Sequence, residues 1–153
     1  MPNLELKIPP VVVWFAVAAA MGLAARAGSA LDFPLPFRRS LVCGFAFAGV
    51  LVAVLGVVSF RRAGTTVNPL KPDGTSALVV SGIYRVTRNP MYLGMLLVLL
   101  GLACYLGNVV AFLLLPSFAL YLNRFQIAPE EKVLTVLFGA EFTTYRATVR
   151  RWL

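Results

Sequence analysis

Residues able to bind or transform a charged ligand gather in two short polar stretches of this 153-residue chain. The first is residues 82–94, with the sequence GIYRVTRNPMYLG, and the second is the pair Glu130 and Glu131, which Arg124 precedes by six residues. Arginine, asparagine and tyrosine donate hydrogen bonds to anions, whereas glutamates accept them from hydroxyl and ammonium groups. The chain contains no histidine, so it lacks the commonest general base and the commonest metal ligand, and we expect no metal site.

The two stretches flank a run of 35 residues without charge, residues 89–123. As a helix rising about 1.5 Å per residue, this run reaches about 52 Å, against about 60 Å for two crossings of the hydrocarbon core. The sequence Leu-Gly-Asn at residues 106–108 is a turn signal. We therefore predict a tight hairpin with helices at residues 91–105 and 109–123.

A hairpin returns to the side on which it starts, so we expect the two polar stretches to lie together. The side chains expected to converge are Arg88, Asn89, Tyr92, Arg124, Glu130 and Glu131. Each type also has a plain structural role: arginines reach lipid phosphates, tyrosines line the interfacial belt, and glutamates favour a helix start. Two acids, several donors and two tyrosines at one membrane edge exceed what anchoring requires, which favours a functional pocket.

The composition is typical of a protein that lipid surrounds. Hydrophobic residues make up 59% of the chain and charged residues 13%, against about 45–50% and about 25% in soluble domains. Residues 8–25 and 40–60 are two further charge-free runs. We predict an all-α integral membrane protein with about four transmembrane helices, the last two a tight hairpin. It forms a single membrane domain, residues 1–153, with two generic spans in residues 1–60.

The positive charges are distributed unevenly about these four spans. The net charge is +8, and the positive-inside rule makes the richer side cytoplasmic. We therefore expect both termini in the cytoplasm of a prokaryotic inner membrane, with the lipid bilayer and no nucleic acid as partner. The richer side has Lys7, Arg61, Arg62, Lys71, Arg85, Arg88, Arg124, Lys132, Arg146, Arg150 and Arg151, and the other side has Arg26, Arg38 and Arg39.

Two cytoplasmic parts are predicted beyond the spans. The loop at residues 61–88 is too long for a plain connector. The tail begins with Pro129 and two glutamates, which suits a helix start, and Gly139 can end that helix. A second helix follows, with Phe142, Tyr145 and Val149 on one face. We expect this amphipathic, basic pair of helices at the cytoplasmic interface.

Gly-x-Tyr-Arg-x-x-Arg-Asn-Pro-Met-Tyr-Leu-Gly, followed after 35 residues by Glu-Glu, resembles a known family. It is similar to the isoprenylcysteine carboxyl methyltransferase and phospholipid methyltransferase superfamily of integral membrane methyltransferases. Those enzymes carry Arg-His-Pro-x-Tyr and then a Glu-Glu pair. The resemblance extends upstream through residues 63–69 and 78–82, and downstream through Leu134, residues 138–139 and Tyr145. It covers roughly residues 60–153, a methyltransferase-like core with a cofactor pocket.

The resemblance implies S-adenosylmethionine as the methyl donor, bound by the loop, the open end of the hairpin and the tail. The absence of a Gly-x-Gly-x-x-Gly sequence agrees with a site outside any dinucleotide-binding fold. Asn89 stands where the family usually has histidine; it can donate and accept hydrogen bonds but cannot carry an imidazolium charge. By similarity, the cofactor-binding positions are Gly82, Tyr84, Arg88, Asn89, Pro90, Tyr92, Glu130 and Glu131. From the chemistry of their side chains, the catalytic candidates are Arg88, Arg124 and Glu131.

The expected function is S-adenosylmethionine-dependent methyl transfer to a hydrophobic or lipid-linked acceptor at the cytoplasmic membrane face. Arginine can orient a carboxylate acceptor by a bidentate pair, whereas an amine or thiol needs a glutamate or tyrosine as base. Carboxylate, amine, thiol and phospholipid acceptors all stay open, and so does the oligomeric state. Two alternatives are a non-catalytic membrane scaffold or lipid-binding protein and an NADPH-dependent membrane reductase. Cofactor binding separates the three.

Overall fold

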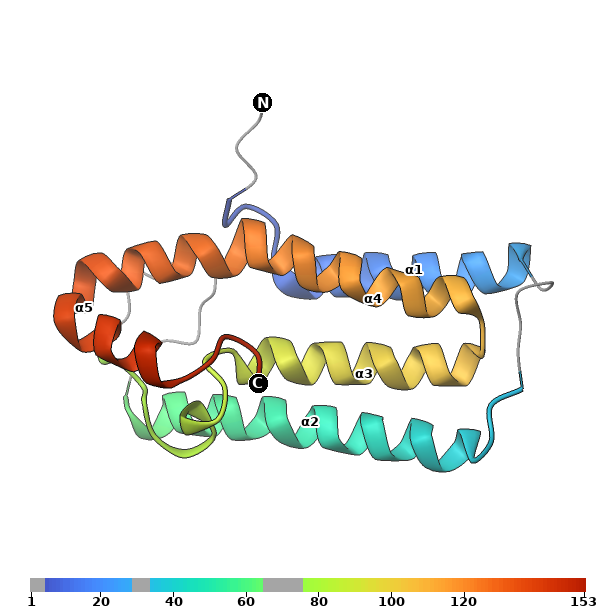
Figure 1. The fold of residues 1–153 in the computed structure, drawn as a ribbon, viewed down its shortest axis with the longest axis horizontal. Coiled ribbons are helices and arrows are strands. Elements are labelled where there is room, and N and C mark those ends of the chain that lie inside the picture. Colours follow the sequence, from blue (N-terminus) through green and yellow to red (C-terminus); the bar gives the residue numbers. More distant parts are fainter. Residues whose placement is uncertain (1–4, 29–33, 65–75) are drawn as a thin grey trace.

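The structure is a computed structural model that describes residues 5–28, 34–64 and 76–153. It is all-helical, as predicted, and its long helices lie along one common direction (Figure 1). Residues 65–69 of the upstream motif, and Lys71, lie outside the described residues. The elements in chain order are α1 (Pro10–Ala27), α2 (Arg38–Arg62), the 3-10 helix η3 (Gly82–Arg85), α3 (Pro90–Leu106), α4 (Val109–Leu122), the π-helix η4 (Asn123–Ile127) and α5 (Ala128–Thr148).

Three helical stretches are long and apolar enough to cross a membrane. They are α1, α2 and the continuous stretch Val109–Thr148, which joins α4 to α5. The two N-terminal spans lie within two residues of their predicted bounds. Helix α3 is apolar but shorter, at 17 residues, which corresponds to about 25 Å against a hydrocarbon core of about 30 Å.

Helices α2 and α3 approach each other closely because glycines face each other between them. A Cβ atom added to Gly49 would lie 2.6 Å from the carbonyl oxygen of Gly94, and one added to Gly94 would meet the carbonyl oxygen of Gly49. Nearer the polar end, a Cβ on Gly56 would lie 3.1 Å from Cγ of Pro90, the first residue of α3. Small residues allow such approach in membrane bundles. This contact therefore places the start of α3, and the residues just before it, against α2.

The predicted hairpin between α3 and α4 is confirmed, and hydrogen bonds of Asn108 stabilise its turn. Gly107 ends α3 with a left-handed φ of 62°, which glycine adopts without strain. Asn108 begins α4: its side-chain oxygen accepts from the amide of Val110 at 2.9 Å, and its Nδ2 donates to the carbonyl of Gly28 at 3.0 Å. The hairpin turn is thus bonded to the residue that follows α1. Near the beginning of α1, Trp14 Nε1 also donates to the Met95 carbonyl of α3 at 2.9 Å.

The connection between α4 and α5 differs from the prediction of a separate helix beginning at Pro129. Helix α4 instead continues through the π-helix η4 into α5 without a break. Proline has no amide hydrogen to donate to the carbonyl of Phe125 four residues before it. That carbonyl accepts the amide of Leu6 at 3.0 Å instead. The N-terminal segment therefore compensates the missing helical hydrogen bond.

The predicted break at Gly139 is confirmed, with φ 50° and ψ −118° inside α5. After this residue the helix turns back over the end of the bundle (Figure 1). Its apolar face does not stay free, because Phe142 and Tyr145 are buried against Val79 and Tyr84. The helix ends at Thr148, so Val149 is its C-cap residue and not part of it, but Val149 packs with Phe142 and Tyr145 as predicted.

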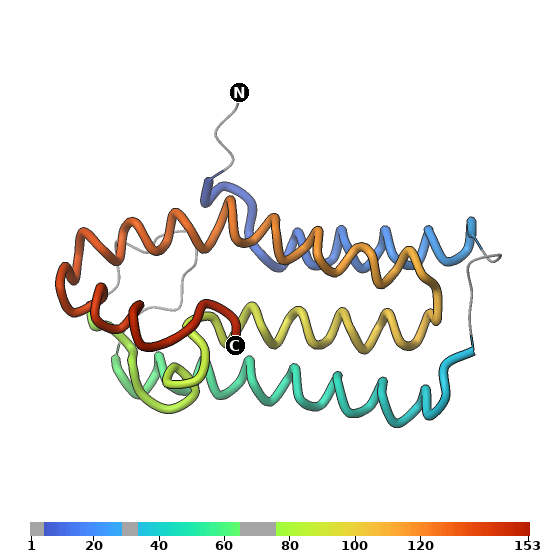
Figure 2. The backbone as a smooth tube through the Cα atoms, in the orientation of Figure 1, coloured from blue at the N-terminus to red at the C-terminus, as the bar shows by residue number. Residues whose placement is uncertain are grey.

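The chain then runs back to the beginning of α3, where Figure 2 shows the C-terminus. The amide of Arg88 donates to the carbonyl of Arg150 at 3.1 Å. This return closes one end of the bundle and brings a third stretch of sequence to the two polar ones.

Candidate active site

Glu131 is the centre of the polar end of the bundle. Its Oε1 accepts from Arg88 Nη2 at 2.9 Å and from Arg151 Nε at 3.1 Å, and its Oε2 accepts from Arg151 Nη2 at 2.5 Å. The side chains of Arg88 and Glu131 are only 10% and 11% exposed, whereas that of Arg151 is 34% exposed. One buried carboxylate is therefore shared by two guanidinium groups, which leaves an excess of positive charge.

The two other nitrogen atoms of the Arg88 guanidinium differ in their hydrogen bonding. Its Nη1 donates to the carbonyl of Arg146 at 3.0 Å, while its buried Nε has no hydrogen-bond partner among the residues that the structure describes. Desolvation lowers the pKa of Arg88 and the charge of Glu131 opposes this shift, and a guanidinium stays protonated in proteins. A buried donor on a fixed cation is suited to an anionic group of a ligand.

Glu130 belongs to a second, separate network. Its Oε1 accepts from the hydroxyl of Tyr92 at 2.6 Å and from Nε2 of Gln126 at 2.6 Å. Burial raises the pKa of Glu130 to about 7, although the hydrogen bonds from Gln126 and Tyr92 favour its carboxylate form. Glu130 can therefore exchange a proton near neutral pH, whereas its neighbour Glu131 is held by two arginines.

Asn89 is used by the chain itself. Its Nδ2 donates to the carbonyl of Arg151 at 2.9 Å, and the hydroxyl of Thr87 donates to the same carbonyl at 3.3 Å. Asn89 lies at the N-cap position of α3 but its side chain makes no capping hydrogen bond there. The side-chain amide of Asn89 thus holds the C-terminal segment.

The 3-10 helix η3 sets the other wall of the site. Gly82 begins it with a φ of 62°, and a Cβ there would lie 3.1 Å from Oγ of Ser59. Tyr84 is buried, its carbonyl accepts from the hydroxyl of Tyr145 at 2.8 Å, and burial raises its pKa well above the usual range. Pro90 is fully buried at the start of α3. These predicted positions therefore support the site through their backbone and packing.

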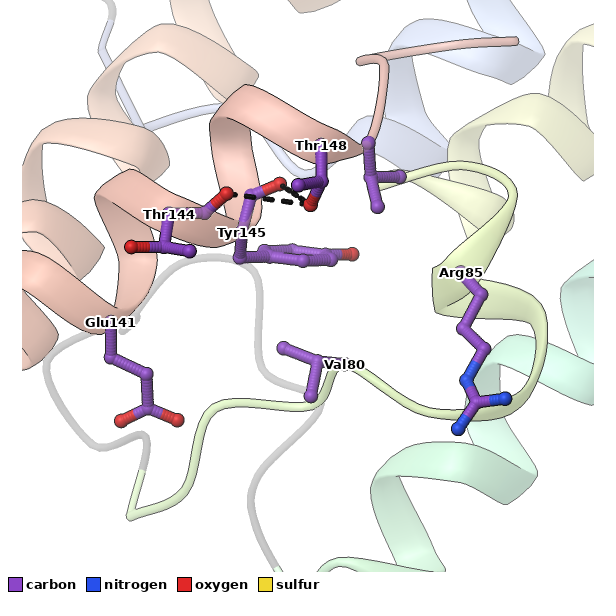
Figure 3. A pocket seen from close by; sticks show the side chains of 7 residues that line it. Val80, Arg85, Glu141, Thr144, Tyr145 and Thr148 are labelled. Carbon is purple, nitrogen blue, oxygen red and sulfur yellow. Dashed lines mark hydrogen bonds between the residues drawn. The ribbon is translucent and has the colours of Figure 1, made fainter.

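A cavity of about 550 Å³ opens between η3, the segment before it and the second half of α5. Its lining residues are Val80, Arg85, Glu141, Thr144, Tyr145, Thr148 and Val149. In Figure 3 the ring of Tyr145 faces Val80 across the cavity, and Arg85 and Glu141 lie at opposite ends. Tyr145 lies between this cavity and the polar network: it lines the cavity, its hydroxyl donates to the Tyr84 carbonyl, and the carbonyl of the next residue, Arg146, accepts from Arg88.

The expected convergence is confirmed for five side chains and wrong for one. The five that the networks bring together are Arg88, Asn89, Tyr92, Glu130 and Glu131. Arg124 instead pairs with Glu5 at 2.8 Å, and its side chain is 63% exposed. Seven residues of a regular α-helix would place Arg124 on the same face as Glu131. Arg124 instead lies in the π-helix η4, whose wider turn changes the rotation per residue and directs it to another face.

Two residues of these networks, Gln126 and Arg151, could not be singled out as site residues from the motif, and neither could Asn123, whose Oδ1 accepts from Arg151 Nη1 and Trp152 Nε1. Gln126 stands four residues before Glu130, a spacing that puts two helical side chains together and was available as a signal. Arg151 had no such signal, because it reaches Glu131 only after the chain reverses at Gly139. Within the described ranges, no three side chains of the histidine, cysteine, aspartate or glutamate type gather where they could hold a metal ion.

Comparison with known proteins matches residues 37–141 to the phospholipid methyltransferase family. A Schizosaccharomyces pombe protein-S-isoprenylcysteine O-methyltransferase is 30% identical over 122 residues, 78% of this chain and 50% of that protein. A probable protein-S-isoprenylcysteine O-methyltransferase of Oryza sativa subsp. japonica is 32% identical over 108 residues, 69% of this chain and 55% of that protein. An uncharacterized protein of Haemophilus influenzae is 49% identical over 63 residues, 41% of this chain and 100% of that protein. No solved structure matches.

The family match covers more than half of the chain and includes α2, which sequence analysis treated as a generic span. The chain therefore belongs to the phospholipid methyltransferase family, within the superfamily of isoprenylcysteine carboxyl methyltransferase-like membrane methyltransferases. It spans about half the length of the yeast and rice relatives that it matches.

Proposed function

We propose that the protein is an S-adenosylmethionine-dependent methyltransferase that acts on a hydrophobic or lipid-linked acceptor at the cytoplasmic membrane face. One observation carries the proposal. In a chain of this family, the motif around Arg88 and the glutamate pair come together at one end of the helix bundle, beside an open cavity.

The residues present fit the proposed cofactor. S-adenosylmethionine combines an adenosine with a chain that carries an ammonium, a carboxylate and a sulfonium. A cavity of about 550 Å³ lies within the usual range of ligand pockets, about 300–1,000 Å³. It offers the ring of Tyr145 for stacking and Glu141 for hydroxyl or ammonium groups. Arg88 does not line the cavity; its Nε, in the adjacent network, has no hydrogen-bond partner among the described residues and is the donor that we assign to a carboxylate.

When bound, the cofactor supplies a methyl group already activated by its sulfonium, so the protein mainly has to align the acceptor and exclude water. We assign Arg88 to the binding of an anionic group, because its guanidinium is charged, buried and fixed by Glu131. We assign Glu130 to proton exchange with the acceptor, because its pKa of about 7 permits both forms at neutral pH. Arg124 has no role in this proposal, since it points to Glu5.

We further propose four membrane crossings with both termini in the cytoplasm. The polar end of the bundle and eleven of the fourteen basic residues then lie on the same side. In that orientation a water-soluble cofactor reaches the cavity from the cytosol, and an acceptor with a lipid tail reaches the site along the apolar helices.

The proposal is tested by calorimetric titration of detergent-purified protein with S-adenosylhomocysteine. Two variants report on the site: the double variant Glu130→Gln/Glu131→Gln disrupts both networks, and Glu141→Gln changes only an exposed residue of the cavity. Circular dichroism confirms that each variant is folded, and Glu5→Gln, whose partner Arg124 is exposed, serves as the control. Saturable binding that both site variants weaken and the control retains supports the proposal.

Absence of binding by the folded wild-type protein overturns it. Titration with NADPH then separates the two remaining classes, because a reductase binds this nucleotide and a scaffold binds neither.

A further inference from the structure

The C-terminal residues 150–152, which we call the C-terminal strap, lie across the start of the candidate site. The backbone of the strap contacts three consecutive residues of the predicted motif. The carbonyl of Arg150 accepts from the amide of Arg88, and the carbonyl of Arg151 accepts from the side chains of Asn89 and Thr87. These contacts join residues about sixty positions apart in the sequence, so only the folded chain makes them.

Two side chains hold the strap in place. Trp152 donates from Nε1 to Oδ1 of Asn123 at 3.1 Å, and its ring packs against the apolar core of the bundle. Arg151 binds Glu131 with two donors, Nε at 3.1 Å and Nη2 at 2.5 Å. A guanidinium that bonds both carboxylate oxygens fixes the plane of the carboxylate, which a lysine ammonium cannot do.

We propose that Arg151 is a positioning residue of the candidate site. Through Glu131 it orients the guanidinium of Arg88, and through its carbonyl it orients the amide of Asn89. Its effect on ligand binding rests on the proposed function, whereas its effect on Arg88 does not.

The mechanism follows from the geometry of one oxygen. Oε1 of Glu131 accepts from both Arg88 Nη2 and Arg151 Nε. When Arg151 is removed, the carboxylate loses the partner that holds Oε2, and it can rotate. Arg88 then follows the carboxylate, and its free Nε no longer points in one direction. Ligand affinity falls because part of the binding energy must order these groups again.

The first experiment compares Arg151→Met, Arg151→Lys and the control Arg150→Met. Arg150 is exposed, so its replacement removes the same charge and volume one residue away. The readout is the nitrogen–proton NMR signal of Arg88 Nε in detergent-solubilised protein, assigned by its loss in Arg88→Lys. We expect one sharp signal in the wild type and in Arg150→Met, and a broadened or shifted signal in Arg151→Met. An Arg88 signal that Arg151→Met leaves unchanged overturns the proposal.

The second experiment measures S-adenosylhomocysteine affinity for the same variants at a temperature where circular dichroism shows each one folded. We expect at least about a tenfold weaker affinity for Arg151→Met, a partial recovery for Arg151→Lys, and wild-type affinity for Arg150→Met. Equal affinities for the Arg151→Met and Arg150→Met proteins, with only a lower melting temperature for the former, assign Arg151 a merely structural role and overturn the proposal.

The two experiments separate this proposal from the proposed function. If the wild type binds no S-adenosylhomocysteine, the function fails, and the NMR signal of Arg88 still decides whether Arg151 positions it. If the wild type binds and the Arg88 signal does not respond, the function stands and the positioning role fails.

Discussion

Replacing Glu131 with glutamine removes the negative charge that the guanidinium groups of Arg88 and Arg151 both contact. The side chains of Glu131 and Arg88 are 11% and 10% exposed, and breaking such a buried pair costs about 3–5 kcal/mol. The side chain of Arg151 is 34% exposed, so its ion pair with Glu131 contributes about 0.2–1 kcal/mol. Glutamine keeps one acceptor oxygen, which recovers about 1 kcal/mol. We therefore expect a loss of about 3 kcal/mol in the free energy of unfolding.

For a chain of this size, that loss corresponds to a fall of about 6–12 °C in the melting temperature. Thermal unfolding followed by circular dichroism in detergent measures it. The matched control is Glu5→Gln, because Glu5 also pairs with an arginine, at 2.8 Å, but the side chain of that arginine is 63% exposed. We expect the control to melt with the wild type, since exposed pairs contribute little.

The outcome that refutes this reasoning is an equal effect of the two substitutions. Burial, and not the presence of an ion pair, is the cause that we assign to the stability of the Glu131 cluster. Equal melting temperatures for Glu131→Gln and Glu5→Gln mean that the cluster is hydrated as well as the surface pair is.

Three further predictions concern packing, hydrogen bonding and pH. Gly49→Ala places a Cβ 2.6 Å from the carbonyl oxygen of Gly94 and should destabilise the fold by about 1–3 kcal/mol, whereas Gly44→Ala, with nothing within 4 Å, should melt no lower than the wild type. Tyr145→Phe removes a buried 2.8 Å hydrogen bond to η3 and should cost about 1 kcal/mol, with faster amide exchange in η3 as a second readout. The pKa of Glu130 rises from an ordinary 4.5 to about 7 on folding, so folding favours the protonated form. The free energy of unfolding should therefore fall on the order of 3 kcal/mol as pH rises through this interval. Melting temperatures from about pH 5 to about pH 8 should show this fall in the wild type and not in Glu130→Gln; parallel curves contradict the assignment.

The spans, the hairpin and the break in the last helix could be predicted because their causes are local. A charge-free run of about 20 residues is long enough to cross the hydrocarbon core whatever it packs against. Gly107 ends α3 in the left-handed conformation that glycine adopts readily, and Gly139 lies at the break in α5. That Arg88 lies near Glu131 could be predicted from the hairpin alone, because the two residues flank it.

The direction of individual side chains could not be predicted in the same way. Arg124 was expected at the site because it lies near the glutamates in sequence, but the π-helix η4 changes the rotation at Arg124, which pairs with Glu5 instead. Gln126 was overlooked although it stands one helical turn before Glu130. Nearness along a helix does not select a face; the rotation per residue does.

The sequence by itself determined that this protein is a helical membrane protein with two polar stretches brought together by a hairpin. These features depend on composition and on residues close in the chain. Only the tertiary structure decided that Arg151 shares Glu131 with Arg88, that Asn89 holds the C-terminal strap, and that Glu130 has Tyr92 and Gln126 as its partners. The physical reason is that these hydrogen-bond partners come from segments 20 to 62 residues apart, whose approach requires the packing of α2 on α3 and the reversal of α5.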